Sequence, residues 1–156
     1  MKKSEQKDNG DDNQKTFDRK WGASITSLGW TGVPNILIER QQALKLTSLE
    51  LNLILILLKF WWDASNPPYP SKRVIGEMLG KDESTIRRTM KKLEDRGLIQ
   101  REGRYLDLGG QTSNRYVMTG LIKKLEEEAR QMTALRQSRQ EQDAQIKNGK
   151  KITTTA

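Results

Sequence analysis

The sequence predicts a mainly α-helical fold with one small β-hairpin, followed by a long C-terminal helix. Three observations predict it: apolar residues recur at spacings of three and four, Gly and Pro separate these segments, and Gly109-Gly110 lies between two short strand-like runs. A length of 156 residues favours one domain with tails. The apolar fraction of 34% is below the usual globular share, so part of the chain should lie outside the core.

The first 20 residues predict a disordered, charged tail. They contain six Lys or Arg and five Asp or Glu, and Phe17 is their only large apolar side chain after Met1. No apolar stretch follows the start, so we expect no signal peptide. The most apolar run, 49–62, has about 14 residues, whereas a membrane span needs roughly 20. We therefore expect a soluble, cytoplasmic protein that is not in a membrane.

The first core helix is predicted from Ser48 to about Asp63. Residues 21–38 mix apolar residues with Gly and Pro, so we expect irregular structure there, with a short strand near Ile36–Ile38. Thr47 and Glu50 have the spacing of a capping box. The helix after them is apolar on nearly all sides, which is typical of a buried central helix. Its end is set by three prolines in residues 66–70. Of the adjacent Trp61 and Trp62, one should be core and the other a partner surface, where base stacking by Trp62 is one alternative.

Two short helices follow. Ser71 is an expected N-cap for a helix that reaches Leu79, and Gly80 is an expected C-terminal stop. Asp82 is the expected N-cap of the next helix, and Gly97 is its expected stop signal, so this helix spans Asp82–Gly97. In this helix an apolar stripe faces inward, while the opposite face is polar and basic. The stripe consists of Ile86, Met90 and Leu93.

A hairpin and a long helix complete the pattern. The hairpin strands are expected at 98–103 and 113–118, with Gly109-Gly110 as the turn. Thr119 should cap a final helix over 121–146, and we expect residues 147–156 to be disordered. The apolar positions of this helix fade toward its end.

Two helices joined by a glycine turn and followed by a hairpin form a helix-turn-helix with a wing. Gly76 stands where the second helix should cross the first closely. The second helix of such a pair enters the major groove with its N-terminal residues toward the bases, while other basic side chains and helix N-termini contact phosphates. The candidate DNA-binding residues are Ser71, Lys72, Ser84, Thr85, Arg87, Arg88, Lys91, Lys92, Arg101, Arg104 and Arg115.

Several stretches together resemble the bacterial winged helix-turn-helix family, over roughly residues 29–120. Glu83 and Gly76 depart from the residues that are usual in the family. The resemblance implies double-stranded DNA binding by a protein of a bacterium or mobile element, since the family includes replication initiators and small transcription regulators. The stretches that carry it are 69–71, 75–80, 84–88, 92–99 and 113–116, with 33–35 and 47–50 upstream.

Composition supports a polyanionic partner and excludes several enzyme classes. The formal charge is +8, and residues 71–104 hold ten Lys or Arg against six Asp or Glu, which is a net +4. There is no Cys and no His, which excludes thiolate metal sites, cysteine nucleophiles, Ser-His-Asp hydrolases and His-ligated zinc. No constellation of catalytic residues stands out. We therefore expect no enzyme activity, no catalytic or metal site and no cofactor, and no small-molecule ligand is evident.

Three functional interpretations remain open. The first is sequence-specific double-stranded DNA binding as a small transcription regulator. The second is an accessory replication initiation factor of a plasmid, phage or other mobile element, and the third is a winged-helix module that contacts only proteins. A homodimer through Leu121–Leu135 is a further expectation. The alternatives are that the same helix packs onto its own domain or serves as a partner-binding arm.

Overall fold

The computed structural model describes residues 9–152, which fall into two compact units. The first unit is Met1–Gly32 and the second is Val33–Ala156. The limits expected from the sequence place the winged domain at 29–120 and a separate helix after it. In the structure the helix belongs to the same unit as the hairpin.

The first unit contains α1 (Asn9–Trp21) and α2 (Ala23–Thr26), so residues 9–20 are helical where a disordered tail was predicted. The physical reason lies beyond residue 20. The ring of Phe17 packs 4.6 Å, centre to centre, from the ring of Trp30, and the hydroxyl of Thr26 donates a hydrogen bond to Asp18. Trp30 and Thr26 lie outside the first 20 residues, so the composition of that segment gives no sign of these contacts. The remainder of the predicted tail, residues 1–8, lies outside the described residues.

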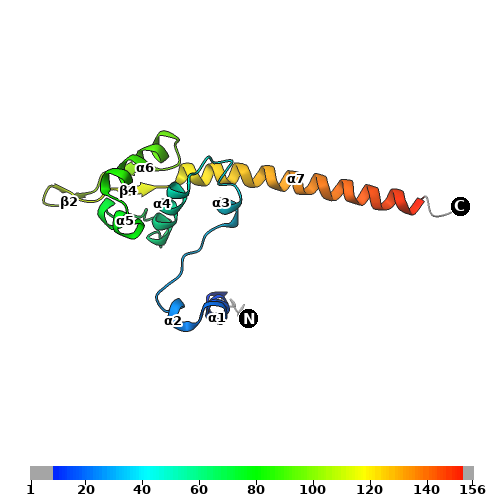
Figure 1. Ribbon diagram of the computed structural model, residues 1–156, viewed down its shortest axis with the longest axis horizontal. Helices are drawn as coiled ribbons and strands as arrows, with labels where there is room; N and C mark the ends of the chain where they lie inside the picture. Colours follow the sequence, from blue (N-terminus) through cyan, green and yellow to red (C-terminus); the bar gives the residue numbers. More distant parts are fainter. Residues whose placement is uncertain (1–8, 153–156) are drawn as a thin grey trace, which may run out of the picture. The chain divides into compact units, whose positions relative to one another are not determined.

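The second unit is a helical core with a hairpin, which confirms the predicted fold class (Figure 1). Within it α5 and α6 pack against each other, α4 packs on both, and α3 packs on α7. Thr47 forms the predicted capping box with Glu50 at the start of α4. The helices are α3 (Asn35–Glu39), α4 (Ser48–Lys59), α5 (Lys72–Leu79), α6 (Glu83–Asp95) and α7 (Thr119–Ile152).

The hairpin has two antiparallel pairs of strands. At its base β1 (Gln100–Glu102) pairs with β4 (Arg115–Val117), with Arg101 opposite Tyr116. Farther out β2 (Tyr105–Leu106) pairs with β3 (Gly110–Gln111). Gly109 adopts a φ of 84° in the turn between them, a conformation that favours glycine.

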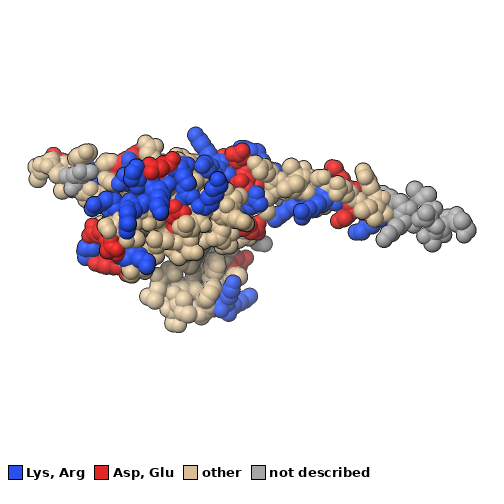
Figure 2. Space-filling model, turned by 45° about the horizontal axis from the view of Figure 1, so that its top comes forward, with Lys and Arg blue, Asp and Glu red and all other residues tan. Residues whose placement is uncertain are grey.

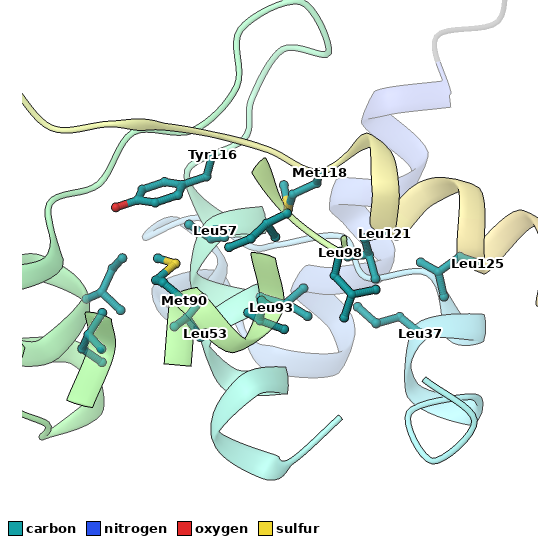
Figure 3. Packing of buried hydrophobic residues seen from close by; sticks show 14 residues of the cluster. Leu37, Leu53, Leu57, Met90, Leu93, Leu98, Tyr116, Met118, Leu121 and Leu125 are labelled. Atoms are coloured by element: carbon teal, nitrogen blue, oxygen red, sulfur yellow. The ribbon is translucent and has the colours of Figure 1, made fainter. Parts of the chain in front are cut away.

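One hydrophobic core joins α3, α4, α5, α6, β4 and α7, together with Leu98 and Ile99 just before β1. Leu53, Ile54 and Leu57 of α4 and Ile86, Met90 and Leu93 of α6 are fully buried. In Figure 3, Leu37 of α3, Leu98 before β1, and Leu121 and Leu125 of α7 lie together at one end of this core. Burial of Tyr116 and Met118 ties the base of the hairpin to the helices.

Three further expectations differ from the structure. The helix predicted to reach about Asp63 ends at Lys59, with Phe60 as its C-cap, so the prolines in 66–70 do not set its end. Residues 35–39 form α3, whereas a short strand was predicted at 36–38. Here Leu37 is buried in the core from a helical turn that begins after Pro34. At the other end α7 continues to Ile152, through most of the predicted tail at 147–156, because each added helical residue gains a backbone hydrogen bond. Residues 153–156 lie outside the described residues.

The helices that the structure describes include none long and apolar enough to cross a membrane. Among the same residues there is no group of three or more carboxylates suited to hold a metal ion.

Candidate nucleic-acid interface

The turn between α5 and α6 sets the angle between the two helices. The Ser71 hydroxyl accepts a hydrogen bond from the Val74 N–H at 3.2 Å, which caps α5 as predicted. Gly80 ends α5 in the left-handed conformation, with a φ of 61°. Asp82 then accepts from the Thr85 N–H at 2.8 Å, so α6 begins at Glu83.

Gly76 is required by the close approach of this turn. A Cβ atom on Gly76 would lie 2.5 Å from the Lys81 carbonyl oxygen and 3.7 Å from the Ile86 side chain. The sequence predicted a close approach by α6 itself. The nearer contact is the backbone of the turn, which also donates a hydrogen bond from Lys81 to the Gly76 carbonyl at 2.9 Å.

The outward face of α6 is basic and open to solvent. Its stripe of Ile86, Met90 and Leu93 is buried, so the opposite side chains face away from the core. Figure 2 shows a band of Lys and Arg over this part of the molecule, interrupted by a few carboxylates. Lys91 pairs with Asp95 at 2.9 Å, one helical turn away. We call the exposed members the α6 face: Ser84, Arg87, Arg88, Lys91 and Lys92.

The cap of α6 also fixes two candidate hydroxyl groups. Ser84 and Thr85 both donate their hydroxyl protons to the Asp82 carboxylate. These hydrogen bonds, with that of the Thr85 N–H, hold the pKa of Asp82 well below its usual range. Because the protons are committed to Asp82, each hydroxyl presents lone pairs and would act as an acceptor toward a ligand. Arg88 already donates to the Thr85 hydroxyl at 3.3 Å.

The N-terminus of α5 opens into a hollow of about 450 Å³. Ser71, Lys72 and Arg73 line it from α5, Glu83 from α6, and residues 112–114 from the hairpin. The structure therefore brings the predicted Ser71 and Lys72 to one surface with the start of α6. Sequence reasoning missed Arg73, which pairs with Glu77 at 2.8 Å. Its position in the first turn of α5, next to Lys72, is the sequence feature that could have identified it.

Arg101 forms an ion pair within the protein. Its guanidinium pairs with the Glu94 carboxylate at 2.5 Å, and its backbone N–H donates to the same carboxylate at 3.1 Å. The hydrogen bond with Glu94 raises the pKa of Arg101 above its ordinary value. This pair fastens β1 to α6 and neutralises a charge that was predicted to contact DNA.

The other two hairpin arginines face a second hollow, of about 710 Å³. The Arg104 guanidinium lies 3.9 Å from the centre of the Tyr69 ring, which is a cation–π contact. The loop after α4 supplies further aromatic lining, which sequence reasoning did not place beside the hairpin. We call this hollow the aromatic groove and define it by Phe60, Trp62, Tyr69, Arg104 and Arg115.

Trp61 and Trp62 separate as predicted. Trp61 packs half-buried against the core, whereas the side chain of Trp62 is 80% exposed in the aromatic groove. At the tip of the hairpin, residues 105–110 contain no Lys or Arg, and Leu106 and Leu108 are exposed there. The basic residues of the hairpin therefore lie at its base and not at its tip.

Comparison with known proteins agrees with this architecture. Residues 44–99 match the family model described as a helix-turn-helix domain. The N-terminal domain of the DnaD protein from Geobacillus kaustophilus HTA426 is 19% identical, with a TM-score of 0.56 over 76% of this chain and 96% of that one. A possible transcriptional regulator from Methanosarcina mazei Go1 is 23% identical, with a TM-score of 0.43 over 70% of this chain and 85% of that one. Of these two, the DnaD domain is similar enough to indicate a shared fold. No curated protein sequence matches the chain significantly.

Proposed function

We propose that the protein binds double-stranded DNA sequence-specifically and acts as a small transcription regulator, and the match of residues 44–99 to a helix-turn-helix domain model supports this proposal. The observation that carries the proposal is the α6 face, which is basic and exposed on the side opposite the buried stripe of α6. A helix with this exposure fits the major groove, where Arg pairs with guanine and hydroxyl groups serve several bases.

In this proposal, different residues contact the bases and the phosphates. Arg87, Arg88 and the two hydroxyl groups of Ser84 and Thr85 lie in the first two turns of α6, so they reach base edges. As acceptors, these hydroxyls suit the amino groups of cytosine or adenine. Lys91 and Lys92, a turn farther along, contact phosphates. Ser71 and Lys72 at the N-terminus of α5 form a second phosphate contact.

The experiment is fluorescence anisotropy on duplexes from the DNA that flanks the protein's own coding region, with scrambled duplexes for comparison. We expect tighter binding to one flanking segment, with an affinity that falls steeply as salt rises. Footprinting on the same DNA then locates the site.

A charge-matched pair of variants separates the α6 face from general basicity. One variant changes four residues of the face to Ala: Arg87, Arg88, Lys91 and Lys92. The other changes four exposed basic residues of α7 to Ala: Lys123, Arg130, Arg139 and Lys147. Loss of duplex binding in the first variant alone supports the proposal. Equal losses in both, or no duplex binding by the wild type at low salt, would refute it and favour a protein-interaction module.

A further inference from the structure

The aromatic groove is a separate concave surface at the base of the hairpin. Its residues come from the loop that follows α4 and from the hairpin, and none of the described residues of α6 line it. Its volume of about 710 Å³ lies in the range of small-molecule and nucleotide sites. It is therefore large enough for its own ligand, distinct from whatever the α6 face contacts.

Two of the three rings in this groove are exposed to solvent. The side chain of Trp62 is 80% exposed and that of Tyr69 is 52% exposed, and Phe60 lies half-buried beside them. Large exposed rings that gather around a hollow indicate a contact surface. Every nucleobase has a flat π face that can stack on such rings, so this contact does not depend on the nucleotide sequence.

The charges of the groove select an anionic ligand. Arg104 lies on the face of Tyr69, and Arg115 is exposed on the same lining. Among the described residues of the lining, the one carboxylate is Asp63, which is hydrogen-bonded within its own turn. It accepts hydrogen bonds from the Ser65 N–H at 3.0 Å, the Ser65 hydroxyl at 2.8 Å and the Asn66 amide at 2.7 Å. The two guanidinium groups are thus placed to hold phosphates next to stacked bases.

We propose that the aromatic groove binds an unpaired DNA strand, with Trp62 and Tyr69 stacking on bases and Arg104 and Arg115 holding phosphates. A duplex keeps its bases inside the stack, where an exposed indole reaches them only if a base is extruded. An acidic peptide would satisfy the arginines but would offer no π faces to the rings. The inference does not depend on duplex binding by the α6 face, and the test measures the two activities separately.

The probe is a fluorescein-labelled thymidine oligomer of about 12 nucleotides, within the range of known single-strand site sizes. Its affinity for the full chain is measured by anisotropy, beside that of a duplex of random sequence. We expect Trp62→Ala to weaken binding of the oligomer about 5-fold or more, with Trp62→Phe retaining most of the affinity. Trp21→Ala, which removes another exposed Trp from a different unit, is the control and should have no effect. The duplex affinity of Trp62→Ala should equal that of the wild type.

The salt dependence provides a second readout. Each single-strand phosphate contact contributes about 0.7 to the slope of log affinity against log salt. Arg115→Ala should therefore reduce the size of that slope by about 0.7 for the oligomer. The proposal is overturned if the wild type does not bind the oligomer at low salt, or if Trp62→Ala binds it as tightly as the wild type. Equal weakening of oligomer and duplex by Trp62→Ala would also overturn it, because the groove would then belong to the duplex surface.

Discussion

Arg96, at the end of α6, and Glu50, in the first turn of α4, form an ion pair with 2.7 Å between Nη2 and Oε1. The Glu50 side chain is 4% exposed, and its other oxygen accepts a hydrogen bond from the Thr47 N–H at 2.8 Å. Arg96 also donates to the carbonyl of Lys45 at 2.6 Å. The pair therefore joins the end of α6 to the start of α4 and to the turn before it.

Glu50→Gln should destabilise the protein by about 1–3 kcal/mol near neutral pH, because Arg96 loses its charged partner. Burial by itself would raise the pKa of Glu50, but hydrogen bonds from Thr47 and Arg96 outweigh burial and lower it from its ordinary value. A lowered carboxyl pKa stabilises the fold above the unfolded value and loses that effect as pH falls through the folded value. The difference between variant and wild type in denaturant unfolding should therefore shrink as pH falls below about 4.5. A difference that stays constant down to about pH 3 would contradict this assignment.

Gly120→Ala should destabilise the protein by roughly 1–3 kcal/mol through overpacking. A Cβ on Gly120 would lie 1.9 Å from the carbonyl oxygen of Gly97, a backbone atom that cannot rotate away. The Leu121 N–H also donates to the Leu98 carbonyl at 2.9 Å, so the two segments are held together. Thermal unfolding measures the change, and Lys123→Ala, at an exposed position of the same helix, is the control. Equal midpoints for Gly120→Ala and the wild type would show that α7 does not start against this turn.

Gly76→Ala and Gly76→Leu should both lower stability, and the larger side chain should lower it more. Even the Ala Cβ would lie 2.5 Å from the Lys81 carbonyl, so the turn must shift. We expect a loss of about 1–3 kcal/mol in denaturant unfolding, with Glu77→Ala on the exposed face of α5 as the control. Unchanged stability in both Gly76 variants would mean that the turn between α5 and α6 adapts freely.

Arg88→Ala should weaken binding to the cognate duplex by about 1–3 kcal/mol and relax the preference at one base pair. Arg88 lies on the side of α6 opposite Met90, within the first two helical turns. Lys92→Ala is the comparison, since a phosphate contact should weaken cognate and random duplexes alike. Anisotropy with a set of single-base variants of the site measures both effects. If Arg88→Ala weakens all duplexes equally, Arg88 contacts only a phosphate.

Truncation after Thr119 should unfold or strongly destabilise the domain, by about 4 kcal/mol or more, because it removes Leu121 and Leu125 from the core. Arg40 also loses its ion pair with Glu128, at 2.5 Å. Truncation after residue 137 keeps these contacts and should preserve the thermal midpoint. A stable 1–119 fragment would refute the role of α7 as a packing element.

Sedimentation of the full chain tests the homodimer that was expected through Leu121–Leu135. Leu121 and Leu125 are 3% and 9% exposed within their own chain, so they are not available to a partner. Leu135, at 58% exposed, is the most open large apolar side chain of that surface, and Ile122 is 37% exposed. If a homodimer forms, sedimentation should show that it depends on the part of α7 near and beyond Leu135. A full chain that sediments as a monomer at all concentrations would end the dimer proposal.

The helix limits near the candidate site follow from local signals in the sequence. Ser71, Gly80 and Asp82 act on backbone groups within four residues, so each predicted cap is present in the structure. The buried stripe of α6 was equally predictable, because a helical repeat of 3.6 residues determines which side chains share a face. The same reasoning placed Arg87 and Arg88 on the outward face of that helix.

Tertiary structure decided which charges stay available and why residues 9–20 are helical. Arg101 and Arg115 look equivalent in the sequence, yet Arg101 is paired with Glu94 on α6 while Arg115 lines the aromatic groove beside Trp62. Phe17 lies in a polar segment whose composition predicted disorder, and its ring packs against the ring of Trp30. The sequence alone determined the caps, the amphipathic faces and the helix-turn-helix, because these depend on neighbours within one or two helical turns. Contacts between residues far apart in the sequence depend on how the core brings their segments together. Local sequence patterns do not encode these contacts.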